Sequence, residues 1–180
     1  MAPEDSDSRQ DWVLAALDSY ESRLLRYAQR LVGDEHLARD VVQHAFLQLC
    51  LQSPRELNGR LGSWLYAVCR NRAIDHKRRN CRLESFAGGG EHEAASREAD
   101  PAEILETSDA GELVRRAIAR LPERQQEVVN LWSEGFAYRE ISEITGAAES
   151  YVRVMMHRAF HSLRENPLLR PLIEEEADVR

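Results

Sequence analysis

The stretch "RNRAIDHKRRN", residues 70–80, gathers five of the protein's 24 basic residues, although the whole chain carries a formal net charge of −7. Residues 60–82 hold seven basic residues and a single acid, Asp75. Phosphates attract such a cluster strongly, and a basic helix face can follow a nucleic-acid backbone. The alternative is a solvated charged face, but the density of the cluster favours contact with nucleic acid.

The apolar run "SWLYAV", residues 63–68, adds aromatic rings to this cluster. Trp64, Leu65 and Val68 are predicted to lie on the side of a helix opposite the charges. Trp64 and Tyr66 can also stack on unpaired bases, as aromatic residues do in proteins that bind single strands. For Trp64 alone, a place in the core is the favoured interpretation.

A helix-turn-helix pattern occupies residues 138–165, with a short helix that Gly146 ends and a longer helix over 149–165 that Pro167 ends. Ile141 and Ile144 are predicted to face the core from the first helix. The predicted buried stripe of the second helix comprises Val152, Met156, Ala159 and Leu163. Its predicted outer face comprises Ser150, Arg153, Val154, His157 and Arg158. Donors near the start of such a helix can reach base edges in the major groove, which favours DNA binding over a solvated face.

Apolar residues recur three or four positions apart over 11–32 and 37–49, and Asp34 is suited to cap the second of these helices. Residues 53–62 are predicted to form a loop, with a third helix after it. Residues 84–110 are acidic, contain three successive glycines and indicate a flexible linker. We therefore predict an all-α fold of two small helical domains joined by a flexible acidic linker, the second domain holding the helix-turn-helix. The predicted divisions are a first domain over 1–83, the linker over 84–110, a second domain over 111–165 and an acidic tail over 166–180.

The same sequence disfavours several other classes of protein. The acidic N-terminal stretch is neither a signal peptide nor a membrane anchor, and no apolar run could span a bilayer, so no membrane partner is expected. Cys50, Cys69 and Cys81 form no C-x-x-C pair, which favours a reducing cytoplasm. His157 and His161 are spaced like a metal pair but lack a third ligand. No catalytic pattern stands out, so no metal, cofactor or enzymatic activity is expected; a helical metal-dependent hydrolase is the rival from another class.

Several segments together resemble one family. They are "DVVQHAFLQL" (40–49), "SWLYAVCRNRAIDHKRR" (63–79), "LPERQQEVVNL" (121–131), "EGFAYREISEITG" (134–146) and "VRVMMHRA" (152–159). On these segments the chain resembles a bacterial RNA polymerase sigma factor of the extracytoplasmic-function (ECF) group, within the sigma-70 family. The resemblance implies a cytoplasmic subunit that binds the clamp helices and flap of core RNA polymerase and recognises promoter DNA. It leaves open an anti-sigma factor as a further partner. The competing interpretation is a stand-alone two-domain helix-turn-helix regulator that binds DNA without polymerase.

The resemblance also implies which side chains form each interface. The implied contacts with polymerase are Asp40, Gln43, His44 and Gln48. The implied contacts with the minus-ten element are Arg60, Trp64, Tyr66, Arg70, Asn71, Asp75, His76, Lys77, Arg78 and Arg79. The implied contacts with the minus-thirty-five element are Tyr138, Arg139, Glu149, Ser150, Arg153, Val154, His157 and Arg158. The chain departs from the family's usual pattern at His44, where an acid is usual, at Ser142, where alanine is usual, and at Met155, where a polar residue would add a DNA contact.

Overall fold

The computed structural model describes residues 3–57, 59–86 and 109–169. These ranges fold into helices joined by turns, with no strand among the described residues, and the prediction of an all-α fold is confirmed. The chain divides into two compact units, and each is described by itself. Within the described ranges, no helix is both long and apolar enough to cross a membrane.

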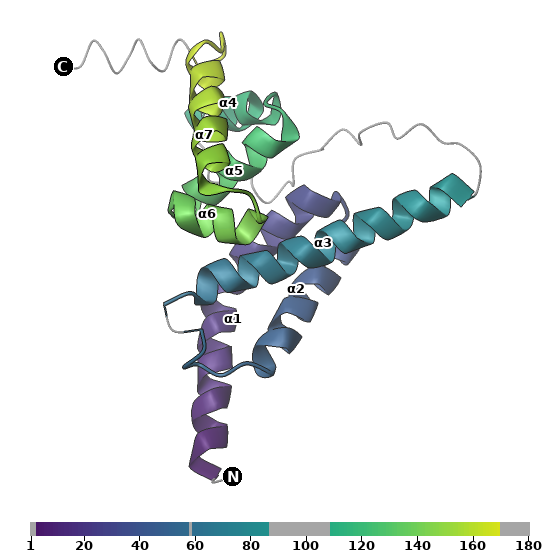
Figure 1. Cartoon of the computed structure of the whole chain (residues 1–180), viewed down its shortest axis with the longest axis vertical. Helices are drawn as coiled ribbons and strands as arrows, with labels where there is room; N and C mark the ends of the chain where they lie inside the picture. Colours follow the sequence, from purple (N-terminus) through teal and green to yellow (C-terminus); the bar gives the residue numbers. More distant parts are fainter. Residues whose placement is uncertain (1–2, 58, 87–108, 170–180) are drawn as a thin grey trace, which may run out of the picture. The chain divides into compact units, whose positions relative to one another are not determined.

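The N-terminal unit consists of three helices, α1 (Pro3–Val32), α2 (Glu35–Cys50) and α3 (Leu61–Phe86), each packed against the other two (Figure 1). The first helix starts well before the expected position at residue 11. The segment that begins it, "PEDSDS", places proline at the first helical position, which favours a helix start there. Arg9 also ties α1 to the loop after α2, because its guanidinium donates to the backbone carbonyl of Gln52.

The start of α2 matches the prediction made for Asp34. The Asp34 carboxylate accepts a hydrogen bond from the Leu37 amide at 2.7 Å, which satisfies one of the free N–H groups in the first turn. Gly33, just before it, has a φ of 74°, a left-handed conformation in which glycine carries no steric penalty. Asp34 and Gly33 therefore fix the corner between α1 and α2.

Small side chains make up much of the interface among these three helices. Ala28, Ala38, Ala45 and Ala73 are all 0% exposed, so the backbones approach one another closely. The wide apolar face predicted for α2 is confirmed, because residues on two adjoining stripes are buried: Ala38, Val41, Val42, Ala45, Phe46 and Leu49. Burial also raises the pKa of the Cys69 thiol to about 12, so this group stays protonated.

The loop between α2 and α3 is held by the buried side chain of Leu57 and by the Glu56 carboxylate, which accepts from the Ser53 amide at 3.2 Å. The third helix begins at Leu61, two residues earlier than the predicted loop allowed, and extends to Phe86. The first three residues of the predicted linker, 84–86, are therefore helical, and its last two, 109–110, begin the next helix. The rest of the linker prediction over 87–108, the acidic stretch over 170–180 and Asn58 lie outside the described residues.

The C-terminal unit contains α4 (Asp109–Ala119), α5 (Glu123–Ser133), α6 (Tyr138–Thr145) and α7 (Glu149–Arg164). The last two helices form the predicted helix-turn-helix, and both pack against α5. Gly146 ends α6 with a φ of 69°, and its amide donates to the Ser142 carbonyl at 2.9 Å. The unit's buried core draws on all four helices: Ala117, Leu121, Val128, Val129, Leu131, Phe136, Ile141, Ile144, Val152, Met155, Met156, Ala159 and Leu169.

Candidate nucleic-acid interface

The buried side of α3 determines which residues of the basic cluster point outward. Leu65, Tyr66, Cys69 and Ala73 are fully buried and share one side of the helix. Trp64 is half-buried and, by helical spacing, belongs with the opposite side of α3. The prediction that Trp64 faces away from the charges is wrong for this reason.

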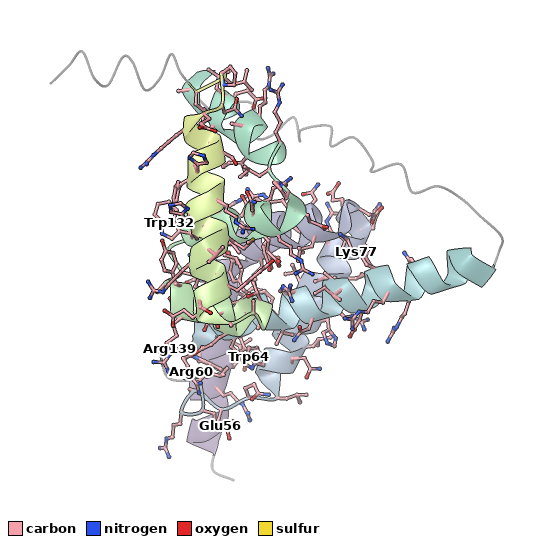
Figure 2. The ribbon with its side chains drawn as sticks, turned by 45° about the horizontal axis from the view of Figure 1, so that its top comes forward. Glu56, Arg60, Trp64, Lys77, Trp132 and Arg139 are labelled. Atoms are coloured by element: carbon pink, nitrogen blue, oxygen red, sulfur yellow. The ribbon has the colours of Figure 1, made fainter. Side chains whose placement is uncertain are left out.

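The outward side of α3 carries Trp64, Asn71, Asp75 and Arg78, which are separated by seven, four and three residues and so lie in one row. The other basic residues lie on the two flanks of that row, with Arg70 and Lys77 on one flank and Arg72 and Arg79 on the other. Arg60, which is exposed, precedes the helix, and its carbonyl accepts from the Ser63 hydroxyl at 3.2 Å. Figure 2 shows Lys77 on α3 and Arg60 and Trp64 near the start of that helix. A half-exposed indole ring therefore lies near the start of the helix whose later turns carry most of the positive charge.

Tyr66 does not belong to this interface. Its side chain is fully buried, and its ring lies 4.9 Å from the ring of Tyr27, centroid to centroid, at an interplanar angle of 42°. A base cannot stack on a ring that two helices enclose, so the implied DNA contact of Tyr66 is wrong. Its role is to join α1 to α3 by an aromatic contact.

His76 lies between the basic cluster and α2. Burial lowers its pKa, and the nearby positive charges of Arg72 and Arg79 lower it further, while Asp40 and Asp75 act in the opposite direction. Its Nε2 atom is buried without a hydrogen-bond partner among the described residues. The imidazole is therefore neutral at pH 7 and adds no positive charge to the cluster.

The outer face of α2 holds the implied polymerase contacts. Asp40 and Gln43 are exposed, whereas His44 and Gln48 are half-buried. The structure adds two residues to this face that sequence reasoning missed, since Leu47 is 59% exposed and Leu51 is 72% exposed. Leu47 follows Gln43 by four residues, and Leu51 follows Leu47 by four. This spacing places all three on one side of a helix, so it could have identified the two leucines from the sequence.

We call Asp40, Gln43, His44, Leu47, Gln48 and Leu51 the α2 outer face. Exposed leucines beside polar side chains are typical of a surface that binds another protein. Asp40 and Gln43 also line a hollow of about 350 Å³ along α1 and α2, whose apolar walls include Leu17, Leu25 and Phe46.

The outer side of α7 follows the prediction closely. Ser150, Arg153, Val154, His157 and Arg158 are all exposed, whereas Val152, Met156 and Ala159 are buried. Leu163, predicted to be buried, is half-buried. Met155 is only 6% exposed and packs in the core, so the idea that a DNA contact is missing at this position is wrong.

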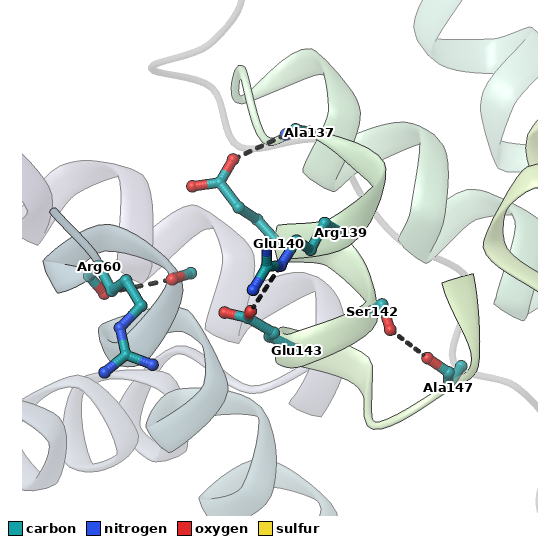
Figure 3. Close-up of polar contacts among 8 residues, drawn as sticks. Arg60, Ala137, Arg139, Glu140, Ser142, Glu143 and Ala147 are labelled. Atoms are coloured by element: carbon teal, nitrogen blue, oxygen red, sulfur yellow. Dashed lines mark hydrogen bonds and ion pairs between the residues drawn. The ribbon is translucent and has the colours of Figure 1, made fainter.

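Arg153 has partners on both helices of the motif. Its Nη2 atom lies 2.6 Å from a carboxylate oxygen of Glu149, one turn earlier in α7. Its guanidinium carbon lies 5.2 Å from the centroid of the Tyr138 ring, at the start of α6. Arg139, also on α6, is mostly exposed and pairs with Glu143 at 3.5 Å (Figure 3).

A hollow of about 290 Å³ lies beside Arg153 and is rich in aromatic and basic side chains. Its lining comprises Tyr138, Arg153, His157, Phe160, His161 and Arg164. The last three were missed from the sequence, although they continue the spacing of Arg153 and His157 along one side of α7. Trp132 on α5 meets Phe160 edge to face at 5.3 Å and is 46% exposed.

The turn between α6 and α7 is held by side chains of α6. The Ser142 hydroxyl donates to the Ala147 carbonyl at 2.6 Å, and the Thr145 hydroxyl accepts from the Ala147 amide at 3.3 Å (Figure 3 shows the Ser142 bond). By contrast, the residues that precede the two helices are Ala137 and Ala148, whose side chains offer no cap. The Glu140 carboxylate accepts from the Ala137 amide at 2.8 Å, which supplies half of a capping box.

In the described part of the chain, no group of three His, Cys, Asp or Glu side chains could hold a metal ion. His157 and His161 therefore have no third ligand among these residues.

Comparison with known proteins places the two units in one family. The sigma-70 region 2 family matches residues 16–83, and the sigma-70 region 4 family matches residues 111–163. The ECF RNA polymerase sigma factor SigL of Mycobacterium tuberculosis is 30% identical over 154 residues, which cover 83% of this chain and 85% of that protein. The ECF RNA polymerase sigma factor SigW of Bacillus subtilis is 23% identical over 166 residues, which cover 87% and 89% of the two chains.

A solved structure shares the fold. The sigma factor RpoE of Bartonella quintana, crystallised in complex with the anti-sigma factor NepR, superposes with a TM-score of 0.65 at 22% identity. The match covers 89% of this chain and 96% of that one. With the family matches and the similarity to SigL, the conclusion is that the chain belongs to the ECF group of the sigma-70 family and is a sigma factor that directs transcription initiation.

Proposed function

We propose that the α2 outer face binds core RNA polymerase, that α3 with Arg60 contacts the minus-ten element, and that α6 and α7 contact the minus-thirty-five element. The proposal includes the division into a first domain over 1–83, which binds polymerase and the minus-ten element, and a helix-turn-helix domain over 111–165, which binds the minus-thirty-five element. The observation that carries it is the α2 outer face, where two exposed leucines lie on the same unit as the basic cluster of α3. Binding to DNA alone does not require such a surface.

The polymerase contact can be tested on α2 without disturbing its core. Gln43→Ala and Leu47→Ala change exposed side chains, so the free energy of unfolding should change by only about 0.5 kcal/mol. The double variant should bind core polymerase at least about tenfold more weakly, because an interface depends on a few central residues. Val114→Ala, which truncates an exposed apolar residue of α4, is the matched control. Equal affinity of wild type and double variant in a titration with core polymerase would remove α2 from the interface.

We assign the contacts with the minus-ten element to the outward side of α3 and to the basic residues on both flanks of that side. Arg78, Arg79 and Lys77 are exposed and positively charged, which suits contact with phosphates, while Trp64, about four turns earlier in α3, is half-exposed and can be reached by a base. The remaining proposed contacts are Arg60, Arg70, Asn71, Asp75 and His76. The neutral imidazole of His76 suits a hydrogen bond rather than an ionic contact.

The minus-thirty-five contacts include Ser150, Arg153, Val154, His157 and Arg158 on α7. All five are exposed on the helix that a helix-turn-helix protein inserts into the major groove. Arg139 of α6 is placed to meet the DNA backbone. The Trp132 and Phe160 pair is a different kind of surface, since exposed aromatic residues favour protein contact, and we assign it to the flap of polymerase.

We propose an anti-sigma factor as a further partner. RpoE of Bartonella quintana was crystallised in complex with such a factor, and we propose that this chain binds one as well. Sigma factors are non-enzymatic regulators of transcription, and we propose that this chain also has no enzymatic activity. We further propose that it acts in the cytoplasm, where RNA polymerase works.

The rival interpretation, a stand-alone DNA-binding regulator, makes the opposite prediction about the free protein. With a net charge of −7, the isolated chain should bind promoter duplex only weakly, at dissociation constants of about 10⁻⁴–10⁻⁶ M that rise steeply with salt. Addition of core polymerase should convert this into specific binding. Tight and sequence-specific gel shifts by the free protein would favour the stand-alone regulator.

A further inference from the structure

Glu149 raises a question that the proposed function leaves open. It is an acid on the first turn of the helix that meets DNA, and its side chain is 40% exposed. A carboxylate at this place repels a phosphate backbone, and an exposed ion pair one turn apart adds little to the stability of a helix. As an acid in the first turn, Glu149 is favoured by the helix dipole, and its contact with Arg153 gives it a second role.

Tyr138 completes the surroundings of that arginine. The guanidinium lies over the tyrosine ring at 5.2 Å, while one of its nitrogens lies 2.6 Å from the carboxylate oxygen of Glu149. The two partners come from different helices, since Tyr138 begins α6 and Glu149 begins α7. Two contacts on different sides of the guanidinium restrict its rotation far more than either would alone.

The orientation of an arginine decides what it can recognise. A freely rotating guanidinium follows phosphates, which carry no sequence information, whereas a fixed one can present two donors to the edge of a guanine. Arginine has five N–H donors, so the contact with Glu149 leaves several for a base. Holding the side chain before binding also removes the entropy loss that ordering it would otherwise require.

We propose that Glu149 and Tyr138 are positioning residues that hold Arg153 as a base reader, rather than DNA contacts in their own right. The inference deepens the proposed role of α7 and rests on it. The residues contact Arg153 from two sides, and the specificity at one promoter position depends on all three. Affinity for DNA of any sequence depends on them much less, and Glu149 lowers it.

The test uses holoenzyme, assembled from cognate core polymerase, and a library of promoters randomised over the minus-thirty-five element. Arg153→Ala first identifies the promoter position that Arg153 reads. Glu149→Gln and Tyr138→Leu should each weaken discrimination at that same position about two- to fivefold, the range expected from losing one exposed cation–π or ionic contact. Tyr138→Phe keeps the ring face and should restore the preference. Glu149→Gln should also tighten binding to non-promoter DNA, because one negative charge is lost.

Combination with Arg153→Ala separates positioning from direct contact. In that background, Glu149→Gln and Tyr138→Leu should cause no further loss of discrimination at the position. The matched control is Glu112→Gln on α4, which removes the same charge from a similar pair, 2.7 Å from Arg116, outside the helix-turn-helix. Loss that persists without Arg153, or that falls at a different promoter position, would overturn the proposal. An Arg153→Ala variant with unchanged promoter preference would instead count against the proposed base contact of α7 itself.

Discussion

The two proposed DNA-binding helices differ sharply in how they carry charge. Residues 60–82, around α3, contain seven basic residues and one acid, whereas residues 138–164, which span α6 and α7, contain four arginines and three glutamates. Each glutamate of the second set contacts a group in its own motif, since Glu140 accepts from Ala137, Glu143 pairs with Arg139 and Glu149 pairs with Arg153. The segment around α3 carries a high density of positive charge, whereas the charged side chains of α6 and α7 are held in place by contacts with one another or with the backbone.

This difference suggests a division of labour between the units. A dense basic surface gives strong, salt-dependent attraction to phosphates, which suits the proposed contact of α3 with the minus-ten element. A nearly neutral motif gives little nonspecific attraction, so its discrimination must come from the placement of a few side chains. The predictions below test this comparison, beginning with the largest expected effect.

Removal of charge from α3 should have the largest effect. Arg78→Ala with Arg79→Ala should reduce open-complex formation by holoenzyme roughly ten- to a hundredfold, because contacts between charged groups are among the strongest hydrogen bonds. Permanganate footprints at several salt concentrations measure the open complex, and affinity for core polymerase should be unchanged.

The matched control removes two exposed arginines from elsewhere in the same unit, Arg26→Ala with Arg55→Ala. An equal defect in the control would show that net charge matters more than the position of the bases on α3.

Distortion of the turn should selectively damage the second unit. Gly146→Ala places a side chain on a left-handed residue, which should lower the free energy of unfolding of that unit by about 1–2 kcal/mol. No atom lies within 4 Å of the added carbon, so backbone strain alone is tested. Gly146→Asn should lose less, because asparagine tolerates this conformation. Denaturant unfolding measures both, and equal stability of all three proteins would show that the turn is not under this constraint.

Addition of a missing cap should stabilise the same unit. Ala137→Ser provides the hydroxyl that completes the half-formed capping box with Glu140, and should raise the free energy of unfolding by about 1 kcal/mol. The same gain is expected from Ala148→Ser at the start of α7, where the backbone is also extended. Thermal unfolding reports the change. If promoter discrimination falls while the free energy of unfolding rises, the helix-turn-helix needs conformational freedom at the starts of α6 and α7. That result would add a further difference between this motif and α3.

A fall in pH should slightly lower the free energy of unfolding of the N-terminal unit, because of the titration of His76. Its pKa is lowered in the folded protein, so below the unfolded value of about 6.5 the unfolded chain takes up the proton more readily than the folded one. Stability is therefore constant above this pH and falls as the pH drops below it. Urea unfolding of wild type and His76→Gln between pH 7.5 and 5.5 would measure this, with a shallower fall expected for the variant. If the free energy of unfolding falls equally with pH in the wild type and in His76→Gln, the assignment of this effect to His76 is wrong.

The sequence allowed most of the helices and the outer side of α7 to be predicted, because those features repeat within one helix. The cap at Asp34, the buried Val152, Met156 and Ala159, and the turn at Gly146 all follow from local spacing. Contacts between helices were harder to predict, because spacing within one helix does not show which residues of another helix lie opposite. Tyr66 was assigned to DNA because it neighbours the basic cluster, and its true partner, Tyr27, lies on another helix.

The support of Arg153 was hidden for a similar reason. Tyr138 precedes Arg153 by fifteen residues, with a turn between them, so no helical periodicity connects the two. Met155 was misjudged because family resemblance was preferred over its own place in the buried stripe. Leu47 and Leu51 were overlooked because they interrupt a polar face, although such interruptions are what a protein interface looks like in sequence.

The alanines between the helices of the N-terminal unit have a mechanical consequence. Ala28, Ala38, Ala45 and Ala73 have side chains too short to change rotamer, and they bring the helix backbones close together between the larger buried side chains. Because close-packed interiors have low compressibility and transmit strain, a displacement of α2 is passed on to α3. Docking of α2 on a large partner would thus aim the basic helix as well, much as the handle of a tool directs its blade.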